Sequence, residues 1–236
     1  VETLHPLVSV IDLSKVDPIN NMRLIFDFYV VFLKEDKNCD LLYGRQRYDY
    51  QKGSIVSLAP GQVIGTEDTG EKFQPKGWAL CFHPDLIRGT TLGRNIKEYT
   101  FFSYEVNEAL HLSEKERTII IDCLEKIRYE LQQSIDRLSK RLIATNIELL
   151  LDYCLRFYER QFITRGNVNH DILTRFERLL DNYFIGPKAA QNGLPSVKEC
   201  ANKLCLSPNY FGDLIKKETG KTAQEYIQYH LILSLI

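Results

Sequence analysis

The hydrophobic pattern changes its period once along the chain, and this change limits the folds that the sequence can adopt. From His5 to about Tyr104, apolar residues alternate or form short runs rich in β-branched and aromatic residues. From Ser113 onward they recur every three or four residues. Period two is typical of strands, and a period near 3.6 is typical of helices. We therefore expect an α+β protein in which the strands come first and the helices follow.

Candidate strands in the first stretch alternate with turn residues. The strands are Leu7–Ile11, Leu24–Phe32, Leu41–Tyr43, Ser54–Leu58 and Trp78–Phe82. The turns are Asp36–Asn38, Lys52-Gly53, Ala59–Gly61 and Pro75–Gly77, whose Asp, Asn, Gly and Pro residues favour tight changes of direction. No helical pattern interrupts this series before Pro84. Short strands at this spacing predict an all-β sandwich or small barrel over residues 1–105.

The second stretch, residues 106–185, predicts a helical region. Ser113 and Glu116 form a capping box, in which a hydroxyl and a carboxylate accept hydrogen bonds from free backbone N–H groups. Apolar stripes follow at helical spacing: Ile120, Leu124, Ile127 and Leu131; then Leu142, Ile143, Ile147, Leu151, Cys154 and Tyr158; then Ile172, Phe176, Leu179, Leu180 and Tyr183. These stripes either cover the strands and one another or pair in part with a second copy of the chain.

Residues 186–236 have the pattern of a helix-turn-helix. The breaker-rich segment Gly186–Pro195 precedes a second capping box at Ser196 and Glu199, which begins a short helix. That helix presents Val197, Cys200, Ala201 and Leu204 to the interior. Two short helices joined by a turn of about three residues are typical of this motif.

The second helix of the motif has clear start and stop signals. Ser207 takes the N-cap, and Pro208 takes the first helical position, where no backbone N–H is needed. The helix ends at Gly220, which suits a left-handed C-cap. We therefore expect a helix at about 208–218.

The residue order of this helix resembles that of AraC/XylS transcriptional regulators. The resemblance runs from Ser207 to Thr222 and continues at Tyr226-Ile227, with a serine cap, a Tyr-Phe pair, an apolar-Lys-Lys run and a glycine. Upstream, Tyr48–Gly53, Ala59–Gln62, Phe82–Leu86 and Phe101–Tyr104 look like the cupin-type sensor domain of that family. The resemblance implies a cupin-like sensor domain over residues 1–105, a helical dimerisation region over 106–185 and part of a DNA-binding domain over 186–236.

The chain departs from that family in three ways. Family members usually carry a second helix-turn-helix after the linker helix, and this sequence stops before it. His230 stands where many members have an arginine, and Ala223 replaces a common proline. Because Val1 is not a start methionine and Leu231–Ile236 ends inside an apolar run, we expect a piece of a longer chain.

The resemblance implies that the helix at about 208–218 reads the major groove of double-stranded DNA. If its apolar residues face inward, helical geometry turns Pro208, Asn209, Gly212, Asp213 and Lys216 outward. An asparagine can pair with adenine, an aspartate can accept from cytosine N4, and lysines suit phosphates. The candidate DNA contacts are Ser207, Asn209, Tyr210, Gly212, Asp213, Lys216 and Lys217, with Lys221 beyond the cap. The alternative is that they form a solvated helix face.

Charge limits how strongly this segment can bind DNA. The chain has a formal net charge of −1, and residues 196–236 carry five lysines against four acids, a net of +1. Each phosphate neutralised adds a salt-dependent increment to affinity, and this segment neutralises few. We expect weak DNA binding by this chain alone, with further affinity from dimerisation or a second DNA-binding unit.

The strand region favours a binding function over catalysis. It contains two histidines, His5 and His83, without an HxH pair, so we expect no metal and no cofactor. No GxSxG, phosphate-binding glycine loop or HExxH motif is present, so we assign no catalytic residue. The aromatic residues Phe26, Phe28, Tyr43, Tyr48, Tyr50, Trp78 and Phe82 either form core or line a pocket for an effector such as a sugar or aromatic acid. The pattern does not indicate which residues contact an effector.

Several properties bear on location and on other functions. Six cysteines without CxxC spacing suggest buried thiols in a reducing compartment, and no apolar run reaches the roughly 20 residues that span a bilayer. We therefore expect a cytoplasmic protein, and the resemblance implies a ligand-responsive regulator that forms a homodimer. The alternatives are a metal-independent cupin-type sugar isomerase or epimerase, and a non-catalytic dimerisation module.

Overall fold

The chain forms two compact units in the structure, a computed structural model that describes residues 5–18, 24–35, 53–64, 72, 74–105, 108–185 and 193–234. The sheet unit consists of Val1–Phe102 and Ala109–Tyr158, and the helical unit consists of Ser103–Glu108 and Glu159–Ile236. The short segment Ser103–Glu108 therefore packs with helices that follow it by more than 50 residues. The three-part division expected from the sequence stays a prediction.

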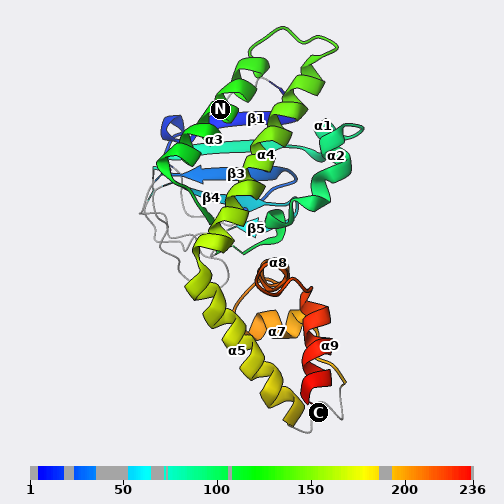
Figure 1. The fold of residues 1–236 in the computed structure, drawn as a ribbon. Coiled ribbons are helices and arrows are strands. Elements are labelled where there is room, and N and C mark those ends of the chain that lie inside the picture. The colour runs from blue at the N-terminus through cyan, green and yellow to red at the C-terminus, as the bar shows by residue number, and fades with distance from the viewer. Residues whose placement is uncertain are drawn as a thin grey trace. The chain divides into compact units, whose positions relative to one another are not determined.

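The sheet unit is built on a five-stranded antiparallel sheet of order β1-β6-β3-β4-β7 (Figure 1). Its strands are β1 (Val8–Asp12), β3 (Tyr29–Lys34), β4 (Ser54–Leu58), β6 (Gly77–Phe82) and β7 (Leu110–His111). A separate pair joins β2 (Leu24–Ile25) to β5 (Val63–Ile64). The expected α+β class is confirmed. Among the described strands, β1 and β7 are the edges of the larger sheet, and the closed barrel stays a prediction.

The strand predictions are confirmed at most described positions and wrong at one. Strand β4 has the predicted bounds, and β1 and β6 begin within one residue of theirs. The predicted strand Leu24–Phe32 is two strands, because the chain leaves the β2–β5 pair at Phe26 and enters the larger sheet at Tyr29. A hydrogen bond from the Gly61 N–H to the Phe26 carbonyl, at 2.8 Å, marks this break. Leu41–Tyr43 and the turn Asp36–Asn38 lie outside the described residues, as do Cys39, Tyr48 and Tyr50.

The centre of the sheet is buried on both faces. All five residues of β4 are buried, and Val30 on β3 and Leu80 on β6 are fully inaccessible. Helices α3 (Glu114–Leu131) and α4 (Ser139–Thr164) cross one face (Figure 1). Most of their predicted stripe residues are buried: Ile120, Leu124, Ile127, Ile143, Ile147, Leu151, Cys154 and Tyr158. These side chains are buried inside a single copy of the chain. The interpretation that they pair with a second copy is therefore wrong for these residues.

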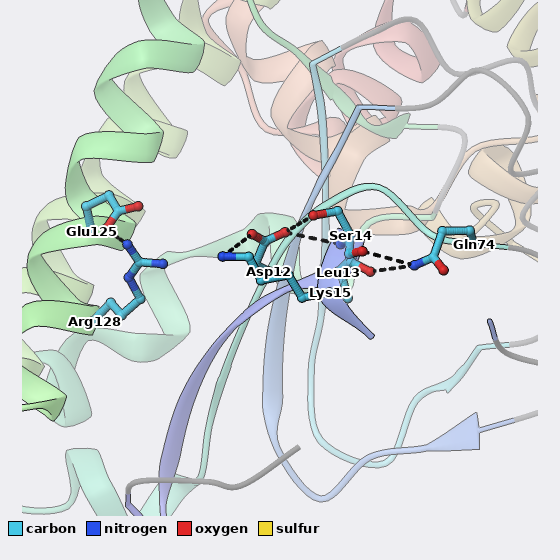
Figure 2. A network of polar contacts seen from close by, with 7 residues as sticks. All are labelled: Asp12, Leu13, Ser14, Lys15, Gln74, Glu125 and Arg128. Atoms are coloured by element: carbon cyan, nitrogen blue, oxygen red, sulfur yellow. Dashed lines mark hydrogen bonds and ion pairs between the residues drawn. The ribbon is translucent and has the colours of Figure 1, made fainter. Parts of the chain in front are cut away.

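Polar contacts hold the turn that follows β1 (Figure 2). The Asp12 carboxylate accepts from the backbone N–H of Ser14 at 3.1 Å and from its hydroxyl at 2.6 Å, which caps the 3-10 turn η1 (Leu13–Lys15). The Gln74 side-chain amide donates to the Leu13 carbonyl at 3.0 Å. Gln74 lies just before β6, so these contacts tie the end of β1 to the start of its partner strand. Figure 2 also shows an ion pair that Arg128 makes on α3.

Gly77 at the start of β6 is required by the close approach of the backbone of β3. Its φ is +114°, and a Cβ built there would lie 2.0 Å from the Leu33 carbonyl oxygen. A side chain at this position would force the two strands apart, so only glycine fits. The turn Pro75–Gly77 therefore sets the register of β6 against β3.

Helices and turns connect β6 to β7. They are α1 (Pro84–Ile87), α2 (Thr91–Asn95), and the 3-10 turns η2 (Ile96–Glu98) and η3 (Thr100–Ser103). His83 caps α1, because its Nδ1 accepts from the Asp85 N–H at 3.1 Å. His5 similarly accepts from the Leu7 N–H at 3.1 Å. Both histidines of the strand region thus have structural partners. Over the described ranges no group of three or more His, Cys, Asp or Glu residues could hold a metal ion.

The described cysteines are all free thiols. Cys123, Cys154 and Cys200 are buried, as expected for small apolar residues, whereas Cys205 is exposed. Burial raises the pKa of the Cys200 thiol to about 11, so it is protonated at neutral pH. None of the described helices combines the length and apolar character needed to cross a membrane.

Candidate nucleic-acid interface

The helical unit contains the predicted helix-turn-helix as α7 (Val197–Lys203) and α8 (Pro208–Thr219). The capping box that begins α7 is confirmed in both directions. The Ser196 hydroxyl accepts from the Glu199 N–H at 3.2 Å, and the Glu199 carboxylate accepts from the Ser196 N–H at 2.8 Å. The Ser196 N–H and hydroxyl both donate to the Glu199 carboxylate at 2.8 Å, and these two bonds lower the pKa of Glu199. Two of the orphan N–H groups that would otherwise destabilise so short a helix are therefore satisfied.

The turn between the helices depends on one residue in the left-handed region. Cys205 has a φ of 60°, and it is the sole described non-glycine residue with a positive φ. This conformation lets the next N–H, of Leu206, donate back to the Ala201 carbonyl at 3.0 Å. Ala201 and Cys200 are fully buried, as the close crossing of two helices requires. The turn therefore carries backbone strain that a glycine would not have.

The ends of α8 match the sequence signals. The Ser207 hydroxyl accepts from the Tyr210 N–H at 3.2 Å, and Pro208 takes the first helical position. At the other end, Gly220 has a φ of 73°, and its N–H donates to the Lys216 carbonyl at 2.9 Å. The helix is thus bounded by a serine cap and a left-handed glycine cap.

The inner face of α8 fixes the rotation of the helix about its axis. Phe211, Leu214 and Ile215 are fully inaccessible to solvent. Phe176 from α5 (Gly166–Ile185) meets Phe211 edge-on, with ring centroids 4.9 Å apart. Helix α9 (Ala223–Ser234) packs on the same core through Ile227, which is also fully buried. With this face enclosed, the opposite face of α8 must point outward.

Four of the seven predicted contact residues lie on that outer face. Asn209, Lys216 and Lys217 are exposed. Gly212 is half-buried, but a Cβ built on it would meet no atom within 4 Å, so open space lies beside this turn of the helix. A glycine facing open space allows another backbone to approach closely. The structure therefore brings together an amide, a glycine and two cations on one exposed surface.

Ser207 and Tyr210 are not on this surface. Ser207 is 2% exposed and Tyr210 is 5% exposed. The Tyr210 ring packs against Tyr104 at 5.2 Å and against Phe162 at 5.1 Å between centroids. In this conformation neither side chain can reach a duplex, because both are covered by their own helical unit.

Asp213 lies at the edge of the outer face and is held by a tyrosine. The Tyr104 hydroxyl donates to its carboxylate at 2.6 Å. Tyr104 belongs to Ser103–Glu108, which we call the clamp segment and of which residues 106 and 107 are not described. A carboxylate that accepts a short hydrogen bond from a tyrosine is already used as an acceptor, so it is less available to a base edge.

The clamp segment makes a second contact, from Glu108 to the N-cap residue of α8, Ser207. Glu108 is 3% exposed, and its carboxylate accepts from the Ser207 N–H at 2.7 Å and from the Ser207 hydroxyl at 2.5 Å. It also accepts from the Glu105 N–H at 2.7 Å. Burial raises the pKa of Glu108 to about 7, and this effect outweighs the hydrogen bonds, which act to lower it. The clamp segment therefore contains a carboxyl group that titrates near neutral pH.

No local pattern in the sequence indicates the clamp contacts. Tyr104 and Asp213 are 109 residues apart, and Glu108 and Ser207 are 99 residues apart. The family resemblance includes Phe101–Tyr104, but it does not indicate what these residues contact. Local sequence does not reveal which distant residue a tyrosine or a buried glutamate will bind. His230 pairs with Asp181 at 2.8 Å.

The charge of the outer face is modest. Lys216 and Lys217 are offset in part by Glu218, whose carboxylate accepts from the buried Asn169 amide at 3.0 Å. The Lys221 ammonium lies 5.2 Å from the centroid of the Tyr229 ring. The local charge therefore agrees with the expectation of few phosphate contacts.

Comparison with known proteins finds a distant likeness among solved structures. No protein-family model matches the chain, and no curated protein matches it. Among solved structures, a point variant of apo ToxT from Vibrio cholerae strain SCE256 is similar over 93% of this chain and 96% of that chain, with 12% sequence identity and a TM-score of 0.34. The likeness is distant, and the function proposed below rests on the residues of this chain.

Replacing Cys205 by glycine should stabilise the helical unit. Glycine adopts a φ of 60° without the Cβ clash, so the substitution removes strain from the folded state. This relief outweighs the greater freedom of glycine in the unfolded chain, and we expect the free energy of unfolding to rise by about 1 kcal/mol. Thermal unfolding followed by circular dichroism measures it. Cys205→Ala keeps the strain and removes only the thiol, so it should leave stability unchanged. An equal gain in both variants would assign the effect to the thiol.

The Glu108 carboxyl should make stability depend on pH between about 5 and 8. Its folded-state pKa of about 7 lies above the ordinary value of 4.5, so the folded chain binds a proton that the unfolded chain has lost. Stability from this group is complete below the ordinary pKa and is lost as pH rises through 7.

Glu108→Gln cannot titrate, so its thermal midpoint should fall less over this window than that of the unaltered chain. Glu199→Gln is the matched control, because the pKa of Glu199 is lowered and its titration lies below the window. If Glu108→Gln keeps the full slope, the group is not the source of the pH dependence.

Proposed function

We propose that the chain is a DNA-binding transcriptional regulator of the AraC/XylS type, in which α8 enters the major groove. One observation supports this above the others: the exposed face of α8 carries Asn209, Gly212 and Lys216 on a helix whose rotation is fixed by a buried opposite face. A recognition helix needs both properties, because base contacts require side chains held in a defined direction.

The residues on this face divide into two kinds of contact. Asn209 lies in the first turn of α8, where recognition helices contact base edges, and its amide can pair with adenine N6 and N7. Gly212 allows the helix to lie close to the groove, and Lys216 and Lys217 near its C-terminus reach phosphates. Asn209 therefore carries sequence preference, and the lysines carry non-specific affinity.

The clamp segment supplies a physical means of regulation. It holds Asp213 through Tyr104 and the α8 cap through Glu108, and on both sides it continues into residues of the sheet unit. A ligand of the sheet unit that binds the clamped and released states with different affinity would shift the fraction of α8 free to bind DNA. Dimerisation remains part of this proposal, with Leu142 and Leu149, exposed and one heptad apart on α4, as its contact residues.

The double variant Asn209→Ala/Lys216→Ala tests the assignment of the recognition face. Duplexes are selected by the unaltered chain from a random-sequence pool, and the affinity for the selected sequence is measured by fluorescence anisotropy at low salt. We expect at least a tenfold loss, since one bidentate base contact accounts for about 1–3 kcal/mol. The matched control is Asn182→Ala/Arg178→Ala, which removes an exposed amide and an exposed cation from α5.

The control should bind within twofold of the unaltered chain. An equal loss in both doubles would show that net charge alone decides binding, and α8 would not be the reading element. An unchanged affinity in Asn209→Ala/Lys216→Ala would place the DNA contacts elsewhere.

Tyr104→Phe should raise DNA affinity severalfold. The variant removes the hydroxyl that holds Asp213 and keeps the ring that packs on Tyr210. Hydrogen bonds to charged groups contribute about 1.5–3 kcal/mol, which sets the upper limit of the effect. Tyr226→Phe removes a similar 2.6 Å bond, to Glu177, and should leave DNA affinity unchanged. If Tyr104→Phe binds no better than this control, the clamp does not compete with DNA.

A further inference from the structure

The sheet unit has a pocket of about 400 Å³ whose lining is dominated by cations. Its lining residues come from the α1–α2 region and from the start of α4, elements whose positions Figure 1 shows. Five basic side chains line it: Arg88, Arg94, Arg137, Lys140 and Arg141. The remaining lining includes three threonines, one apolar residue, Ala144, and one acid, Glu148. A lining with five cations and one apolar side chain suits an anionic ligand better than a hydrophobic one.

The formal charge of this lining is unusual for the chain. Five cations and one acid give +4, whereas the whole chain has a net charge of −1. Arg88 pairs with Asp85 at 2.7 Å outside the lining, which leaves +3 when that acid is counted. This site therefore has a local excess of positive charge that the net charge of the chain does not reveal.

Two of the cations have no anionic partner within the described part of the chain. Arg137 and Arg141 are exposed, and neither forms an ion pair or hydrogen bond there. Arg94 donates to the Thr91 hydroxyl at 3.3 Å, and Lys140 donates to the Arg88 carbonyl at 3.0 Å. The bond from Lys140 joins the two walls of the pocket. The guanidinium groups of Arg137 and Arg141 remain available to a ligand.

These cations lie near the N-terminus of α4, where an isolated helix favours acidic residues. Lys140 and Arg141 lie in the first turn, which contains no acidic residue, and Arg137 stands two residues before the helix. Cations at a helix N-terminus are repelled by the helix dipole. The nearby Asp136 is already used, since it accepts from the N–H groups of Leu138 at 2.7 Å and Ser139 at 2.9 Å. An anion in the pocket would offset both the mutual repulsion of the cations and their repulsion by the helix.

We propose that this pocket binds a phosphorylated small molecule that carries at least two phosphate groups. Guanidinium groups match phosphate oxygens in bidentate geometry, and four of the five cations are arginines. A single carboxylate would neutralise one of them, whereas two or more phosphates balance a lining of +3 to +4. The volume lies within the range of about 300–1,000 Å³ that is usual for small-molecule sites. The site does not depend on whether the chain binds DNA.

Inorganic triphosphate is the probe that tests the site, with the whole chain titrated by calorimetry at about 0.15 M salt, where diffuse attraction is screened. We expect saturable binding of one equivalent and a rise in thermal midpoint on binding. Arg137→Ala/Arg141→Ala should weaken binding at least tenfold. The control Lys115→Ala/Lys126→Ala removes the same charge from exposed positions on α3 and should bind within twofold of the unaltered chain.

The alternatives give different results. Absence of saturable binding, or equal weakening in both double variants, would overturn the proposal. A short duplex of random sequence is titrated in parallel, and a pocket variant that loses duplex affinity but keeps triphosphate affinity would make this a nucleic-acid surface instead. Because Arg137 and Arg141 are exposed, the variant should unfold without ligand at or above the temperature of the unaltered chain, which separates lost binding from lost folding.

Discussion

The enclosure of one face of α8 is the constraint on which the proposed interface depends. Phe211, Leu214 and Ile215 are fully buried, and Phe176 meets Phe211 edge-on. A helix of 12 residues has little stability by itself, so its direction and rotation come from this packing. Once the inner face is fixed, the positions of Asn209, Gly212 and Lys216 follow from helical geometry without any further interaction.

The N-terminal end of α8 takes part in two sets of hydrogen bonds at once. The Ser207 hydroxyl oxygen caps α8 by accepting from the Tyr210 N–H. The Ser207 hydroxyl and backbone N–H both donate hydrogen bonds to the Glu108 carboxylate. Burying that carboxylate is costly, which is why its pKa rises to about 7 despite its hydrogen bonds. The clamp is therefore a contact of adjustable strength, since protonation changes the charge of its central group. A contact of this kind suits a protein whose DNA-binding helix must be released under some conditions and retained under others.

Charge is distributed unevenly between the two proposed binding sites. The exposed face of α8 combines two lysines with nearby acids, whereas the pocket beside α4 collects five cations around one acid. The composition of the chain, with a net charge of −1, conceals both facts. We therefore expect the pocket to bind phosphate groups more tightly than α8 does. Contacts to base edges then contribute a larger share of the DNA affinity of α8.

Local chemistry in the sequence determined the elements themselves. The two capping boxes, the serine and proline that begin α8 and the glycine that ends it involve residues within four positions of one another, so their energetics are readable from the sequence. The tertiary structure alone decided that Leu24–Phe32 divides between two sheets and that Tyr210 faces inward. It also decided that Tyr104 and Glu108 reach across about 100 residues to α8, and that arginines from two separate segments line one pocket. These features depend on which distant surfaces meet, and an amphipathic pattern specifies that a face is buried without specifying its partner.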